Sequence, residues 1–135
     1  MRNVDPDNTK DLSGGSYSTY NYVLYQPNET SDKALVVAEG GGSGDGMRNV
    51  VLGLGTINEN AVVSHEGFAN RDPDAILDTP VEYTQDNPKY EDGAIVLAYR
   101  YDSLAPGQSI SFDYTYILNE TDLDVALGDL EAVSI

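Results

Sequence analysis

Cysteine and tryptophan are absent from the 135-residue chain, and histidine occurs once. Without cysteine the chain has no disulfide, no thiolate nucleophile and no zinc–thiolate site. Basic residues are scarce too, because 7 Lys and Arg stand against 23 Asp and Glu, which gives a formal net charge of −16. Nucleic acids and anionic lipids require clusters of Lys and Arg, and this chain has none. The composition therefore predicts no nucleic-acid partner.

Long apolar runs are also missing. No stretch approaches the roughly 18 apolar residues of a membrane-spanning helix, and no charged segment followed by an apolar one opens the chain as a signal peptide would. We therefore expect no membrane insertion. A length of 135 residues fits one domain, over 1–135, that is large enough to bury a core.

Alternating apolar and polar residues predict β-strands. In the stretch 17–26, Tyr20, Tyr22 and Leu24 share one face, which is the pattern of a strand with one side toward a core. Compact runs rich in β-branched residues predict further strands at 33–39, 49–57 and 61–68. Six or seven short strands separated by turn residues indicate a mainly β protein, specifically an antiparallel β-sandwich.

The clearest strand pair is predicted over residues 94–118. The runs AIVLAYRY at 94–101 and SISFDYTYIL at 109–118 flank the turn sequence LAPGQ, and this arrangement is typical of a β-hairpin. The alternation in the second run places one set of residues on the core face: Ile110, Phe112, Tyr114, Tyr116 and Leu118.

Two segments have helical signals. In DPDAILD, at 72–78, Asp72 is a candidate N-cap and Pro73 occupies the first helical position. The segment 119–133 spaces its apolar residues helically and carries acids in its first turn, so we expect a short amphipathic helix near the C-terminus. Its apolar residues include Leu123, Ala126, Leu127 and Leu130.

The N-terminal segment concentrates oxygen ligands. Asp5, Asp7, Asn8 and Asp11 lie within seven residues, and Ca²⁺ takes six to eight oxygen atoms in flexible geometry. The spacing is not that of an EF-hand, because Lys10 stands where the motif needs glycine. Two interpretations stay open: a structural calcium site with these four ligands, or a turn in which Asp and Asn side chains bond to the nearby backbone.

The chain offers little for catalysis. Its one histidine, His65, is followed by no nucleophile-elbow motif, and Ser64 beside it points to the opposite face of the predicted strand. We expect His65 to be a surface or turn residue, and we predict no catalytic residues and no enzymatic activity.

Tyrosine is abundant, with 10 copies in the chain. Tyr17, together with Tyr20 or Tyr22, could present rigid amphipathic rings to a ligand. Alternatively, these rings face the core or pair across strands.

Several segments together resemble a known family: MRNVDPDN, ALVVAEG, VVSHEGFANRDPDAIL, LAPGQSISFDYTYILN and ETDLDVALGDL. They are similar to a β-sandwich module, the split or scaffold-type domain, of large bacterial repeats-in-toxin (RTX) adhesins. The resemblance implies a secreted, cell-surface protein that is rich in calcium. It also implies a non-catalytic scaffold or extender module whose partners are the neighbouring domains of the same adhesin, including an inserted ligand-binding domain.

Two departures from that family leave alternatives open. Related modules usually have one or two further strands before MRNVDPDN, so either the missing strands come from elsewhere or these residues are one part of a divided domain. The sequence GGGSGDG at 40–46 is expected to be flexible, either as a natural loop or as a linker that replaces an inserted domain. The alternative function is a calcium-dependent carbohydrate-binding module that uses the tyrosines.

Overall fold

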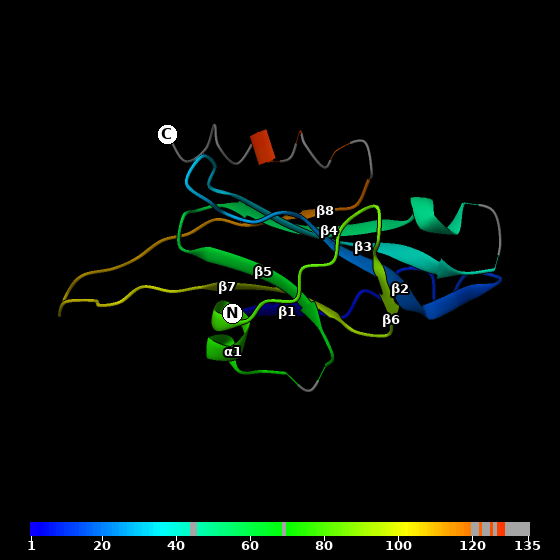
Figure 1. Ribbon diagram of the computed structural model, residues 1–135, viewed down its shortest axis with the longest axis horizontal. Coiled ribbons are helices and arrows are strands. Elements are labelled where there is room, and N and C mark those ends of the chain that lie inside the picture. Colours follow the sequence, from blue (N-terminus) through cyan, green and yellow to red (C-terminus); the bar gives the residue numbers. More distant parts are fainter. Residues whose placement is uncertain (44–45, 69, 120–121, 123–124, 126, 129–135) are drawn as a thin grey trace.

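The chain folds as an antiparallel β-sandwich, which confirms the predicted fold class (Figure 1). The computed structural model describes residues 1–43, 46–68, 70–119, 122, 125, 127 and 128. One sheet has three strands in the order β1 (Arg2–Val4), β7 (Ala94–Tyr99) and β5 (Ala61–Glu66). The other has five strands in the order β6 (Lys89–Glu91), β2 (Gly15–Tyr25), β3 (Lys33–Gly42), β4 (Val51–Ile57) and β8 (Thr115–Ile117).

The main core lies between the two sheets. β3 and β7 are buried along most of their length because each is an inner strand of its sheet. Their inward residues meet those of β4 and β5 in one apolar cluster, made of Ala34, Val36, Ala38, Leu54, Ala61, Val63, Ile95 and Leu97.

Both sheets are also covered on their outer faces. The short helix α1 (Pro73–Asp78) buries Ile76 against Ala94, Val96 and Ala98 of β7. On the five-stranded sheet, Leu127 contributes to a second cluster with residues of four strands. Both faces of each sheet therefore bury apolar side chains, and this accounts for continuous apolar runs such as LVVA in β3.

The structure confirms the helix predicted at 72–78, where α1 spans Pro73–Asp78 and Asp72 is its N-cap. The Asp72 carboxylate accepts a hydrogen bond from the Asp74 backbone N–H at 3.0 Å, and Pro73 opens the helix. The helix predicted over 119–133 lies largely outside the described residues, among which Val125, Leu127 and Gly128 are helical. Among the described residues, no helix combines the length and the apolar character needed to cross a membrane.

The predicted hairpin over 94–118 is wrong. β7 belongs to the three-stranded sheet, whereas β8 pairs with β4 in the other sheet. The turn at Pro106–Gly107 does form, with the Gln108 N–H bonded to the Ala105 carbonyl at 3.0 Å, but the chain then crosses to the opposite sheet. Most of the predicted core-face residues are not buried, because Phe112, Tyr114, Tyr116 and Leu118 are exposed, whereas Ile117 of the other set is buried.

The predicted loop at 40–46 is wrong for its first three residues. Gly40, Gly41 and Gly42 continue β3 to its end and are followed by the 3-10 helix η1 (Met47–Asn49). Glycine is required here because the N-terminal segment passes directly over the strand. The Thr9 hydroxyl donates to the Gly41 carbonyl at 2.6 Å, and a Cβ on Gly40 would lie 2.2 Å from the Thr9 methyl carbon.

Candidate metal centre

The register of β1 and β7 brings together two distant parts of the chain. Val4 pairs with Ile95, so the end of β1 lies beside the start of β7. Asp5 follows β1 directly, and Asp92 stands in the short connection that leads from β6 into β7. These two carboxylates therefore become neighbours although 86 residues separate them in the chain.

A tight turn adds a third carboxylate. The backbone bends after Pro6, where the Asn8 N–H donates to the Pro6 carbonyl at 2.7 Å and the Lys10 N–H donates to the Asp7 carbonyl at 3.2 Å. As a result, carboxylate oxygens of Asp5, Asp7 and Asp92 all lie within 4.8 Å of one another. Asp5 and Asp92 are exposed, whereas Asp7 is half-buried.

The electrostatics of this cluster favour a bound proton or a cation. The pKa of Asp5 is raised to about 6, mainly because partial burial disfavours the carboxylate, and further because of the carboxylates of Asp7 and Asp92. Lys10 opposes this shift. The Oδ1 atom of Asp7 is buried and has no hydrogen-bond partner among the described residues. A buried acceptor without a donor is costly, and a cation would remove that cost.

The donor set fits calcium in chemistry and in size. Calcium binds carboxylate oxygens at about 2.3–2.6 Å, so two oxygens on one ion lie at most about 5 Å apart. The separation of up to 4.8 Å among Asp5, Asp7 and Asp92 agrees with this limit. Three carboxylates that can bind through one or both oxygens, together with water, would supply the six to eight oxygen ligands.

Of the predicted ligands, the structure groups the carboxylates of Asp5 and Asp7. Asp5 and Asp7 lie in the cluster, whereas Asp11 is exposed and does not belong to it. The side-chain N–H groups of Asn8 donate to the carbonyls of Ala38 and Val50 at 3.2 and 2.7 Å. These bonds tie the N-terminal segment to β3 and to the residue before β4. The Oδ1 of Asn8 is buried and has no hydrogen-bond partner among the described residues.

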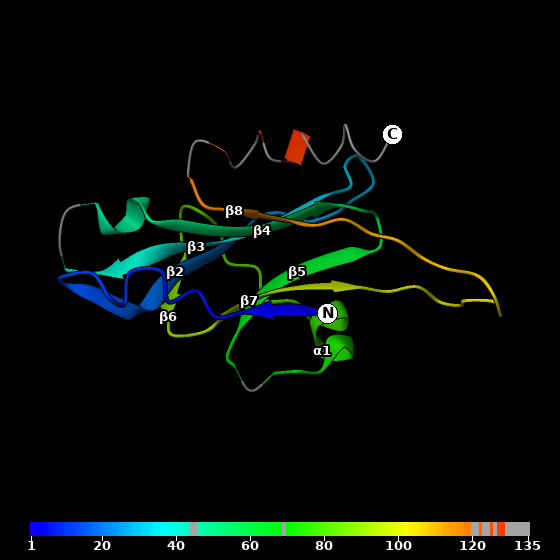
Figure 2. The same cartoon turned by 180° about the vertical axis from the view of Figure 1, so that it is seen from behind.

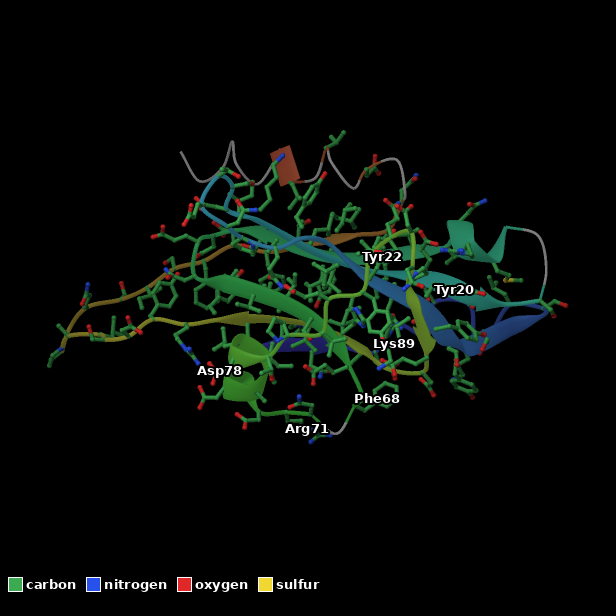
Figure 3. The ribbon with its side chains drawn as sticks, in the orientation of Figure 1. Tyr20, Tyr22, Phe68, Arg71, Asp78 and Lys89 are labelled. Carbon is green, nitrogen blue, oxygen red and sulfur yellow. The ribbon has the colours of Figure 1, made fainter. Side chains whose placement is uncertain are left out.

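The predicted tyrosine surface does not form as one face. Tyr22 is buried at 1% exposure, and its hydroxyl donates to Glu39 at 2.9 Å. Tyr20 packs against Tyr90 with ring centroids 4.6 Å apart, and Figure 3 shows Tyr20 and Tyr22 on β2 beside Lys89 of β6. Tyr17 is exposed. A ligand therefore cannot contact all three rings, because the Tyr22 ring lies in the core.

The prediction for His65 is wrong, because its side chain is fully buried. Its Nε2 accepts a hydrogen bond from the Tyr83 N–H at 3.1 Å. The pKa of His65 is lowered to about 4, mainly by burial and in addition by the nearby charge of Lys89. Both effects keep the ring neutral. The only histidine of the chain is thus part of the packing and is inaccessible to a substrate.

Comparison with known proteins identifies no relative of this chain. No family model, no curated protein and no solved structure matches the chain.

Proposed function

We propose that this chain is a non-catalytic, calcium-stabilised scaffold or extender module of a bacterial cell-surface adhesin, where it presents or supports a ligand-binding domain. The observation that carries the structural part of this proposal is the convergence of Asp5, Asp7 and Asp92. The adhesin context comes from the sequence resemblance described above.

The position of the cluster suits a structural ion. Asp5 and Asp7 lie on the connection from β1 to β2, which runs from the three-stranded to the five-stranded sheet. Asp92 lies on the connection from β6 to β7, which runs in the opposite direction between the same sheets. An ion held by all three carboxylates would therefore fasten both crossovers at one end of the sandwich. Such a clasp would resist separation of the two sheets.

We expect calcium to stabilise the fold. Binding to the folded state alone raises the free energy of unfolding by about 2.7 kcal/mol when free Ca²⁺ is a hundredfold above its dissociation constant. For a domain of this size, that corresponds to an increase in melting temperature of roughly 10 °C. Thermal unfolding followed by circular dichroism, in excess calcium and in excess chelator, measures the difference. Mg²⁺ should give a smaller increase, because it demands stricter octahedral geometry.

Matched variants locate the ion. Asp7→Asn and Asp92→Asn each remove one charged ligand and should abolish most of the calcium-dependent increase. Asp11→Asn is the control, because Asp11 lies in the same N-terminal segment but outside the cluster, and it should retain the full increase. Equal melting temperatures in calcium and chelator for the wild type would refute the clasp. Loss of the increase in Asp7→Asn and Asp11→Asn but not in Asp92→Asn would instead support the ligand set predicted from the sequence.

The calcium effect should also depend on pH. The folded-state pKa of Asp5, about 6, exceeds its ordinary value of 3.8, so the stability that Asp5 contributes to the metal-free protein is lost as pH rises from about 4 to 6. Calcium competes with the proton and binds more tightly once Asp5 is ionised. We therefore expect a larger calcium-dependent increase in melting temperature at pH 7.5 than at pH 5. A larger increase at pH 5 would contradict the assignment of Asp5 as a ligand.

The scaffold role has its own test in the parent polypeptide. A ligand-binding domain inserted beside these residues, or further β-sandwich modules in series, would support a presenting or extending role. Turnover of polysaccharides by the purified chain would contradict the non-catalytic assignment whatever the outcome of the calcium experiments.

A further inference from the structure

One side of the sandwich carries a cavity between its two edge strands. β1 and β8 lie on the same side of the molecule, which faces the viewer in Figure 2. Near them is a cavity of about 230 Å³, lined by Met1, Arg2, Tyr99, Phe112 and Tyr114. We call it the edge cavity. The calcium clasp uses none of these residues.

The strand registers explain why polar and aromatic side chains meet here. Arg2 pairs with Leu97, and Tyr116 pairs with Leu54. Leu97 and Leu54 both belong to the core between the sheets, and cross-strand partners share a face. Arg2 and Tyr116 therefore point into the space between the sheets, where the Arg2 Nε donates to the Tyr116 hydroxyl at 2.6 Å.

Aromatic rings form one wall of the cavity. Phe112 stacks on Tyr99 with centroids 4.2 Å apart and lies nearly parallel to Tyr101 at 6.4 Å. Even so, Phe112 remains 47% exposed, and Tyr114 remains 39% exposed. Further exposed large apolar residues occur in the same stretch of the chain: Tyr101, Leu104, Tyr116 and Leu118. Exposed aromatic rings that are grouped in this way often mark a binding surface, whereas single exposed apolar residues do not.

Arg2 supplies hydrogen-bond donors beside these rings. Four ion pairs occur among the described residues, and they involve Arg48, Lys89 and Arg100 but not Arg2. Instead, the guanidinium lies 5.8 Å from the centre of the Tyr116 ring and uses its Nε for the hydroxyl of that residue. In a chain with a net charge of −16, this arginine is thus free of carboxylates and lines a cavity with its fixed set of donors.

We propose that the edge cavity binds one ring of a neutral saccharide. The apolar face of a sugar ring would stack on Phe112 and Tyr114, while its hydroxyls accept hydrogen bonds from Arg2. The volume of the cavity suits a ligand as small as one sugar ring, because about 230 Å³ is less than the roughly 300–1,000 Å³ of cavities that enclose drug-sized ligands. The net charge of −16 disfavours a polyanionic glycan, so the ligand is neutral.

Other occupants fit the cavity less well. The bond between Arg2 and Tyr116 spans the gap from β1 to β8, so a peptide strand could enter between the sheets only by breaking it. A second copy of the chain would bring another 16 negative charges to the same edge. A sugar ring meets neither obstacle.

The opposite side of the sandwich shows what a closed edge looks like in this protein. There the Gln26 side chain bonds both the N–H and the carbonyl of Val63, each at 2.8 Å, and so joins β5 to the end of β2. The Tyr83 N–H bonds His65, and the Tyr83 carbonyl accepts from the Val23 N–H at 2.8 Å. Backbone and amide groups thus close the side between β5 and β2, whereas side chains with exposed rings line the edge cavity.

The test is direct binding of neutral oligosaccharides to the whole chain. Hexasaccharides of glucose, galactose and N-acetylglucosamine, with hexagalacturonate as the anionic comparison, are titrated by calorimetry and by NMR chemical-shift mapping. We expect a neutral hexasaccharide to bind and to shift the amide resonances of 112–116. Phe112→Ala and Arg2→Ala should each weaken binding at least tenfold. Phe112→Trp, which keeps a stacking ring, should retain it.

Two control variants and a check of folding make the result decisive. Tyr17→Ala removes an exposed ring on another strand and should leave the affinity unchanged. Asp7→Asn disrupts the proposed clasp and should also leave it unchanged, which separates failure of this inference from failure of the calcium proposal. Thermal unfolding confirms that each variant is folded. No binding of any neutral hexasaccharide at 10 mM overturns the proposal, as does tighter binding of hexagalacturonate. Dimerisation in sedimentation that Phe112→Ala abolishes, without sugar binding, would assign the edge to a second copy instead.

Discussion

Replacing Gly41 with alanine is expected to lower the free energy of unfolding by about 3 kcal/mol, as overpacking of a tightly packed site does. A Cβ on Gly41 would lie 2.2 Å from the Ser18 carbonyl oxygen and 2.8 Å from Cε2 of Tyr90. The Ser18 oxygen belongs to the backbone of β2, in the stretch between Gly15 and Thr19 where the register with β3 shifts. Because it is a backbone atom, it cannot move away as the end of a flexible side chain would. Relief of the clash must therefore separate β2 from the end of β3.

Gly67→Ala is the matched control. A Cβ at that position meets nothing within 4 Å, so the substitution should change the free energy of unfolding only by reducing the backbone freedom of the unfolded chain. That effect stabilises by about 0.4–1 kcal/mol when the native backbone conformation suits alanine. Urea unfolding of both variants and the wild type gives the three free energies. Equal stability of Gly41→Ala and Gly67→Ala would show that the contact between β2 and β3 tolerates a side chain.

The glycine run shows how a composition can mislead. GGGSGDG at 40–46 suggests a flexible loop, because glycine-rich segments usually behave as linkers. In the structure, the first three glycines serve a close approach of backbones, since Thr9 and Ser18 pass within contact distance of β3. A sequence does not reveal which segment will cross a strand, so the two uses of glycine cannot be separated before the fold is known.

Strands with local signals were predicted well, whereas their partners were not. The alternation within β2 marks a strand because a period of two residues belongs to the strand alone, and the short apolar runs of β3 and β7, rich in β-branched residues, mark buried strands. Pairing depends on residues far away. The segment around β8 alternates as a hairpin partner of β7 would, yet it pairs with β4 and buries Ile117 on the outer face of the five-stranded sheet, beside Leu127. Both sets of alternate positions in that segment contain apolar residues, so the pattern alone could not fix the face.

The candidate metal centre was predicted in part for the same reason. Asp5 and Asp7 stand close together in the sequence and stay together in the fold. Asp92 enters the cluster only through the register of β1 against β7, in which Val4 meets Ile95. The sequence around Asp92 signals a turn before a strand, through the pair Asp92–Gly93, but not the location of that turn. Asp11 was included because it is near in sequence, and the turn after Pro6 leaves it out of the cluster.

The burial of His65 also depends on a distant segment. β5 is an edge strand, so its side chains would be accessible if nothing packed beside them. The extended connection between α1 and β6 runs along this edge. Its Val81 N–H donates to the Ser64 hydroxyl at 2.8 Å, and its Tyr83 N–H donates to His65. The Tyr83 ring also contacts the imidazole edge-on at 5.5 Å. The neutral imidazole thus accepts a hydrogen bond from the connection between α1 and β6 and helps to hold that connection against β5.

Acidification from pH 6.5 to pH 4 is therefore expected to destabilise the protein through His65. The unfolded histidine binds a proton below its ordinary pKa of 6.5, whereas the folded one resists protonation down to about 4. Because the unfolded state binds more protons in this window, the stability is fully present above pH 6.5 and is lost as pH falls toward 4. A shift of this size corresponds to about 3 kcal/mol at most. Protonation would also place an N–H on Nε2, which would then face the Tyr83 N–H and could no longer accept its hydrogen bond.

His65→Gln tests this expectation, because the amide oxygen of glutamine can accept from the Tyr83 N–H without titrating. The difference in free energy of unfolding between wild type and variant is measured by urea denaturation at pH 4, 5, 6 and 7.5. Taking this difference cancels the contribution of Asp5, which has the opposite sign because its folded-state pKa is raised. The wild type should lose stability relative to His65→Gln as pH falls, with most of the change between pH 6.5 and 4. A pH-independent difference would mean that the imidazole is protonated as readily in the folded chain as in the unfolded one, and would refute its burial as a neutral acceptor.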